Sequence, residues 1–139
     1  MRLPTIAIST GDPAGIGPEI ALKAALHPRV ASLCRPLLVG DPAVVQAHAR
    51  SAGLSSKFHI IAKPGEAKWS TGAVNLLDAG DGSNSPLKFG TVDAAYGRAS
   101  LASARRAIQA ALAGEVDSVV AAPQTAICGF TQILRRNET

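Results

Sequence analysis

The segment spanning residues 5–20 constrains the fold of this chain most, because it predicts a buried strand, a tight loop and a helix in direct succession. Residues 6–8 form a short apolar run rich in β-branched side chains, which is typical of a buried strand. Glycines and prolines then break the chain into a loop. Pro18 suits the first turn of a helix, where a backbone N–H has no intrahelical partner. The loop glycines are Gly11, Gly15 and Gly17.

The succession of strand, loop and helix recurs later in the sequence. A strand is predicted at 35–40, followed by Asp41 as N-cap, Pro42 at the first helical position and a helix to about residue 52. Further strands are predicted at 58–62, 74–78 and 116–122, the last as a buried strand, and the longest helix at 94–113. This alternation predicts the α/β class, with a mainly parallel sheet flanked by helices. A chain of 139 residues can bury the core of one such domain.

The opening loop is the first candidate site for a cofactor or substrate. Loops of this kind direct backbone N–H groups and a helix N-terminus at one point, which suits an anionic group. Its Gly-x3-Gly-x-Gly spacing is neither the dinucleotide fingerprint nor the phosphate loop, so a turn without a ligand is an open alternative. Asp12 is either a functional carboxylate or a turn residue that bonds its own backbone. The candidate residues are Asp12, Gly15, Gly17 and Glu19.

The second candidate site is Gln124 with Thr125, directly after the last predicted strand. Ligands of open α/β sheets bind outside the carboxyl ends of the strands, so both candidate loops are expected to face one crevice. The turn-rich segment 78–90 is interpreted as a solvated connection rather than a lid. His48 and His59 lack metal-ligand spacing and are interpreted as structural or exposed, so no metal site is predicted and the catalytic residues stay unknown.

Three segments carry a family resemblance. The string STGDPAGIGPEI at 9–20 resembles the opening motif of the 4-hydroxythreonine-4-phosphate dehydrogenase family of pyridoxal phosphate biosynthesis. PLLVGDP at 36–42 resembles the family's second strand, and DSVVAAPQTAI at 117–127 its strand and loop at the substrate site. The resemblance implies an isocitrate/isopropylmalate dehydrogenase-like fold in truncated form. Residues 1–127 would be its N-terminal α/β portion and residues 128–139 a divergent tail.

The resemblance also implies an activity. Members use NAD to oxidise and decarboxylate 4-phosphohydroxy-L-threonine or a related phosphorylated hydroxy acid, as cytoplasmic homodimers. They bind a divalent metal (zinc, magnesium or cobalt) through three histidines that lie beyond the segment matched here. Because those ligands are absent, we expect this chain to be incomplete or inactive by itself. Two alternatives stay open: a non-catalytic scaffold or binding subunit of the same family, and an acyl or phosphoryl transferase that uses the opening loop for phosphate.

Composition argues against several other partners. The net charge is +4, but the 14 basic residues are scattered and aromatic residues make up only 4%, so neither a nucleic-acid footprint nor a stacking platform is predicted. No apolar run approaches the length of a membrane span and no leader pattern opens the chain, so we expect a cytoplasmic protein with no membrane partner. A parallel sheet cut short exposes an apolar edge, which predicts low solubility.

Overall fold

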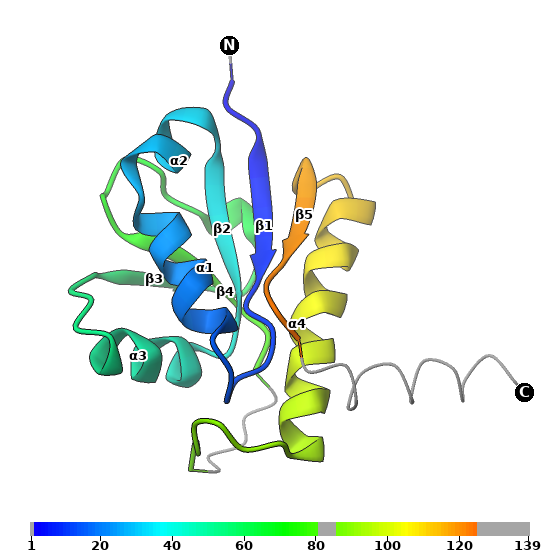
Figure 1. Ribbon diagram of the computed structural model, residues 1–139. Helices are drawn as coiled ribbons and strands as arrows, with labels where there is room; N and C mark the ends of the chain where they lie inside the picture. Colours follow the sequence, from blue (N-terminus) through cyan, green and yellow to red (C-terminus); the bar gives the residue numbers. More distant parts are fainter. Residues whose placement is uncertain (1, 81–85, 125–139) are drawn as a thin grey trace, which may run out of the picture.

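The computed structural model describes residues 2–80 and 86–124, and it confirms the predicted parallel sheet flanked by helices (Figure 1). The strands are β1 Thr5–Ser9, β2 Arg35–Gly40, β3 Phe58–Ile61, β4 Val74–Asp78 and β5 Ser118–Ala121. The helices are α1 Gly17–Leu26, α2 Pro28–Leu33, α3 Pro42–Ser51 and α4 Ala94–Leu112, with a short 3-10 helix at Pro64–Glu66. The strand order is β3-β4-β2-β1-β5, and all neighbouring strands are parallel.

Each face of the sheet has its own hydrophobic core. Alternate side chains of a strand point to opposite faces, so Ile8 and Leu38 pack with Leu22 of α1 and Val45 of α3. The other face of the sheet packs on α4. The core between them includes Ala7, Leu37, Val39, Leu77, Ala107 and Ala110. Small residues of α4 therefore lie against the sheet, while α1 and α3 cover the opposite face (Figure 1).

Local signals set the helix ends, and Asp41 is the N-cap that the sequence predicted. The carboxylate of Asp41 accepts a hydrogen bond from the Ala43 N–H at 2.9 Å, and Asp93 accepts one from Ala95 at 2.7 Å. Side-chain acceptors at the N-cap satisfy N–H groups that the first turn leaves without an intrahelical partner. Gly114, just after α4, has the positive φ of +74° that favours glycine.

Helix α2 was not predicted. The pair His27-Pro28 does end α1, but Pro28 also begins a new helix. His27 is extended and its Nδ1 accepts a hydrogen bond from the Arg29 N–H at 3.2 Å, so it caps α2. A proline that cannot continue one helix is well suited to the first turn of the next.

The prediction that the last strand is buried was wrong. Among the described residues β5 lies at the sheet edge beside β1 alone, and Val120 is 51% exposed. Val120 pairs in register with Ile8 and so shares its face, but α1 and α3 cover that face only farther along the sheet. Val119 points to the other face and packs partly on the core beneath α4. The side of β5 that carries Ser118 and Val120 is therefore uncovered.

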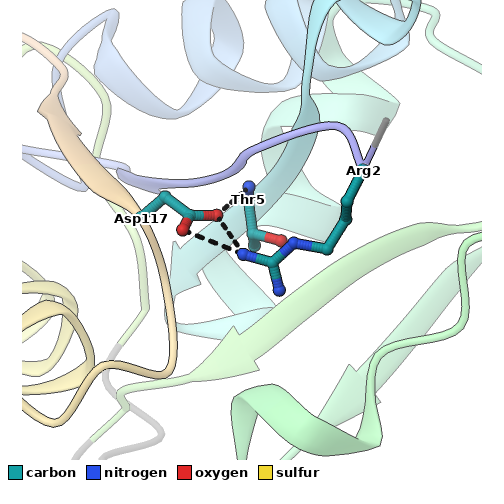
Figure 2. A network of polar contacts seen from close by, with 3 residues as sticks. All are labelled: Arg2, Thr5 and Asp117. Atoms are coloured by element: carbon teal, nitrogen blue, oxygen red, sulfur yellow. Dashed lines mark hydrogen bonds and ion pairs between the residues drawn. The ribbon is translucent and has the colours of Figure 1, made fainter.

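A polar cluster fastens β1 to β5 at their amino ends (Figure 2). The Asp117 carboxylate accepts two hydrogen bonds from the Arg2 guanidinium at 3.0 and 3.1 Å and one from the Thr5 N–H at 2.8 Å. The Asp117 N–H in turn donates to the Thr5 carbonyl at 2.9 Å. This cluster fixes the register of two strands that are far apart in the chain.

The strand order changes direction between β1 and β5. The chain runs from β1 to β2 and on to β3 and β4 on one side, and then crosses by way of α4 to β5 on the other side. Open α/β sheets bind ligands at such a switch point, outside the carboxyl ends of the strands. The loops after β1 and β5 are therefore where a site is expected. Within the described ranges, no helix is long and apolar enough to cross a membrane.

Candidate functional site

The opening loop connects β1 to α1 at the carboxyl end of the sheet. Asp12 is 7% exposed, and its Oδ1 accepts a hydrogen bond from the Ala14 N–H at 2.9 Å. The Gly15 N–H donates to the Asp12 carbonyl at 3.1 Å. Asp12 thus acts as a turn residue that shapes the loop, the second of the two roles that its sequence context suggested.

Two loop glycines are required by packing against the chain that follows β5. Gly11 has φ +75°, and a Cβ there would overlap the Pro123 carbonyl oxygen. A Cβ at Gly17 would overlap the Thr10 carbonyl oxygen and lie 3.0 Å from that of Pro123. The Asp12 N–H donates to the same Pro123 carbonyl at 3.3 Å. The space beside these glycines is therefore filled by the protein's own backbone and is not left for a ligand.

The structure brings the two candidate segments together at Pro123. Gln124 follows that residue and is exposed, whereas Thr125 lies outside the described residues. Gly15 is half-buried, and a Cβ there would make only ordinary contacts with Asp12, the nearest at 3.5 Å. Gly15 and Gln124 are thus accessible to solvent, whereas backbone fills the places that a Cβ of Gly11 or Gly17 would take.

The N-terminus of α1 presents the loop's other polar feature. Its N-cap is Ile16, which supplies no side-chain hydrogen bond to the first turn. A helix start without a capping side chain keeps backbone N–H groups and the positive end of the dipole for an anion.

Glu19 stands in the first turn of α1 and pairs with Lys23, whose Nζ lies 2.7 Å from Oε1. The hydrogen bond from Lys23, then its charge and to a smaller degree that of His48, lower the pKa of Glu19. A lowered carboxyl pKa adds stability that is complete above the unfolded-state value and is lost as the pH falls through the folded-state value. The pair is exposed to solvent, so the effect on stability is small.

We expect Lys23→Gln to raise the pKa of Glu19 toward its ordinary value, because the substitution removes the charge of Lys23 and its charged hydrogen bond, the two largest causes of the lowering. NMR titration of the Glu19 carboxyl carbon measures this directly. Lys63→Gln is the matched control, since Lys63 is exposed and lies before the 3-10 helix, away from α1. An unchanged Glu19 pKa in the Lys23 variant would contradict the assignment.

Sequence reasoning missed two contacts that hold the opening loop, one from His48 of α3 and one from Gly90. His48 is 4% exposed, and its Nε2 lies 2.7 Å from the Pro13 carbonyl oxygen. The Gly90 N–H donates to the Ala14 carbonyl at 2.8 Å. His48 is therefore structural, as predicted, but it contacts the candidate site itself. The sequence alone gave no signal of this contact, because His48 stands in a helix that also carries Gln46 and Arg50.

A small cavity lies beside the loop, between the start of α3 and the start of α4. Its volume is about 60 Å³, and its lining includes Thr10, Gly11, Asp41, Gly80, Tyr96 and Ser103. Such a cavity holds a few water molecules, whereas pockets for small-molecule ligands are roughly 300–1,000 Å³. It is not a dinucleotide pocket.

A metal centre does not fit this part of the chain. In residues 2–80 and 86–124 no three His, Cys, Asp or Glu side chains gather closely enough to hold an ion. Protein metal sites usually need at least three such ligands.

Comparison with known proteins supplies the remaining evidence. Residues 32–127 match the model of a protein family described as pyridoxal phosphate biosynthetic protein PdxA. A protein of Symbiobacterium thermophilum, named "Putative D-threonate 4-phosphate dehydrogenase", is 42% identical over 120 residues, which are 86% of this chain and 36% of that protein. The chain thus spans little more than a third of the length of this relative.

Solved structures of the same kind share the fold. A 4-hydroxythreonine-4-phosphate dehydrogenase from Burkholderia phymatum superposes with a TM-score of 0.85 at 31% identity, over 92% of this chain and 38% of that one. A terephthalate 1,2-cis-dihydrodiol dehydrogenase from Burkholderia xenovorans gives a TM-score of 0.70 at 34% identity, over 91% and 36% respectively.

Proposed function

This chain belongs to the PdxA family of pyridoxal phosphate biosynthetic proteins, and from that premise we propose that it forms the N-terminal, ligand-binding part of an NAD-dependent dehydrogenase. The observation that carries the proposal is the contact of the opening loop with Pro123. The Asp12 N–H bonds the Pro123 carbonyl at 3.3 Å, at the switch point between β1 and β5. Ligands of open α/β sheets bind at this point.

The substrate that we propose is a phosphorylated hydroxy acid, either 4-phosphohydroxy-L-threonine or D-threonate 4-phosphate. The names of the Symbiobacterium and Burkholderia phymatum relatives both contain a 4-phosphate. The positive end of the α1 dipole, whose N-cap Ile16 supplies no side-chain hydrogen bond, supports this choice. Glu19 does not oppose an anion there, since Lys23 neutralises its charge at 2.7 Å.

NAD, if bound, would accept a hydride from the carbon that bears the substrate's secondary hydroxyl while that hydroxyl gives up its proton, and loss of CO2 from the resulting keto acid would complete the reaction that we propose. The residues of this chain have supporting tasks. Asp12 holds the turn through the Ala14 N–H, and Gly15 and Gln124 border the place where the ligand lies. We propose that this part of the chain binds ligands without turning them over by itself, since no three of its described His, Cys, Asp or Glu side chains gather to hold a metal ion.

A second substrate class is suggested by one comparison. The Burkholderia xenovorans relative is named a dihydrodiol dehydrogenase, and that name contains no phosphate. A dihydrodiol also carries secondary hydroxyl groups, so the same oxidation applies to it. A phosphorylated hydroxy acid needs an anion site at α1, whereas a dihydrodiol does not.

Calorimetric titration of the folded chain tests the proposal. We expect binding of NAD and of one phosphorylated acid in the micromolar range, and none of an unphosphorylated dihydrodiol. Gln124→Glu places a negative charge beside the site and is expected to weaken binding of the phosphorylated acid about tenfold, which equals roughly 1.4 kcal/mol.

The matched control is Gln109→Glu. Gln109 is also exposed, but it lies near the end of α4, whereas the site lies near that helix's start. Equal weakening by both variants would mean that total charge, and not the site, decides binding. Absence of any heat from a chain whose folding is verified would contradict the proposed ligand site.

A further inference from the structure

His48 connects three separate segments around the opening loop. It lies on α3, it is 4% exposed, and its Nε2 is 2.7 Å from the carbonyl oxygen of Pro13 in the loop. A carbonyl oxygen only accepts hydrogen bonds, so Nε2 carries a hydrogen and donates it. A buried carbonyl without such a partner is unfavourable, and the imidazole therefore favours this one position of Pro13.

The third segment packs against the same ring. Phe89 meets His48 edge to face, with ring centroids 4.8 Å apart and an interplanar angle of 86°. The neighbouring Gly90 N–H donates to the Ala14 carbonyl at 2.8 Å. Two successive loop carbonyls, those of Pro13 and Ala14, are thus held by two segments that are distant in sequence.

We propose that His48 is a positioning residue for the ligand site: by holding Pro13 it orders the loop from Asp12 to Gly15, beside which the proposed ligand binds. The internal bonds of the loop involve Asp12 only, through its Oδ1 and its carbonyl. They shape the turn but do not attach it to α3. The hydrogen bond of His48 makes that attachment. That the loop serves a ligand rests on the proposed function. That His48 orders the loop does not.

Amide hydrogen exchange measured by NMR tests the structural part without any ligand. His48→Leu removes the donor while keeping an apolar side chain of similar bulk. We expect it to lower the protection of the Gly15 and Gly90 amides about tenfold relative to amides of β2, the effect of losing about one net hydrogen bond. His48→Gln places an amide N–H near the position of Nε2 and is expected to restore most of that protection.

His59→Leu is the matched control. His59 also contacts a backbone carbonyl through Nε2, that of Glu66 at 3.0 Å, but it is partly exposed and lies on the edge strand β3. His59→Leu should leave the exchange protection of the Gly15 and Gly90 amides unchanged. If His48→Leu does not fold, His48→Asn replaces it, because its shorter amide does not reach Pro13.

Unchanged protection of Gly15 and Gly90 in a folded His48→Leu variant would overturn the proposal, and so would equal losses in the Leu and Gln variants. Titration with NAD is the second measurement: the Leu variant should bind more weakly than the Gln variant. If the unsubstituted chain does not bind NAD, the proposed function fails, and the exchange result still decides whether His48 positions the loop.

Discussion

Gly11→Ala is expected to lower the free energy of unfolding by about 3 kcal/mol, which would leave a domain of this size close to unfolding. Two costs combine at this position. A left-handed backbone conformation costs a non-glycine residue about 1–2 kcal/mol, and forcing extra atoms into a packed region costs about 1–3 kcal/mol. Gly11 has φ +75°, and its Cβ would overlap the Pro123 carbonyl oxygen. Urea unfolding followed by circular dichroism measures the loss.

Gly53→Ala separates these two costs. Gly53 has a similar φ of +66°, but no atom lies within 4 Å of the place that its Cβ would occupy. Only the backbone strain applies, so a loss of about 1 kcal/mol is expected. If both variants lose the same free energy, the loop does not pack on Pro123 as described.

Leu22→Ala is the second substitution with a large expected effect, a loss of about 2–5 kcal/mol. Leu22 has no exposed surface and lies in the core between α1 and the sheet, one turn beyond Pro18. Truncating it removes buried apolar area and leaves a cavity beneath the helix that carries the ligand loop. Thermal unfolding and urea midpoints both report this change.

Leu112→Ala is its control, because it is the same change in the same kind of secondary structure. Leu112 ends α4 and is 84% exposed, so a change within about 0.5 kcal/mol is expected. Comparable losses at the two positions would show that α1 does not pack as found. The difference between the two variants measures burial alone, since helix propensity cancels.

The sequence predicts best those features that neighbouring residues determine. Asp41 and Pro42 mark the start of α3, and Asp93 marks that of α4, because capping is an interaction over two or three residues. Strands β1 and β2 are short apolar runs bounded by turn residues, and the structure finds both where their composition places them. The α/β class follows from the repetition of these local patterns.

Burial and site geometry were less predictable, because they depend on contacts between distant segments. Val120 has the composition of a core residue, but β5 is an edge strand in the described chain. His48 and Pro13 are 35 positions apart, and Gly11 meets Pro123 across most of the chain. No local pattern contains such pairs.

The candidate site residues differ in what the structure shows of their surroundings. Gly15 and Gln124 lie at the expected end of the sheet, and Thr125 lies outside the described residues. Gly17 is needed for the protein's own packing, and Asp12 shapes a turn. A glycine-rich motif alone does not distinguish space left for a ligand from space filled by backbone.

The pairing of β1 with β5 also bears on the order of folding. Thr5 bonds Asp117 and Asp12 bonds Pro123, so the first strand is completed by one of the last described segments. Contacts across so long a stretch of chain carry a large entropy of closure and tend to form late. During synthesis, β1 and β2 can pair while the carboxyl end of β1 still lacks its neighbour. We therefore expect the loop after β1 to be among the last parts of this domain to reach its final shape.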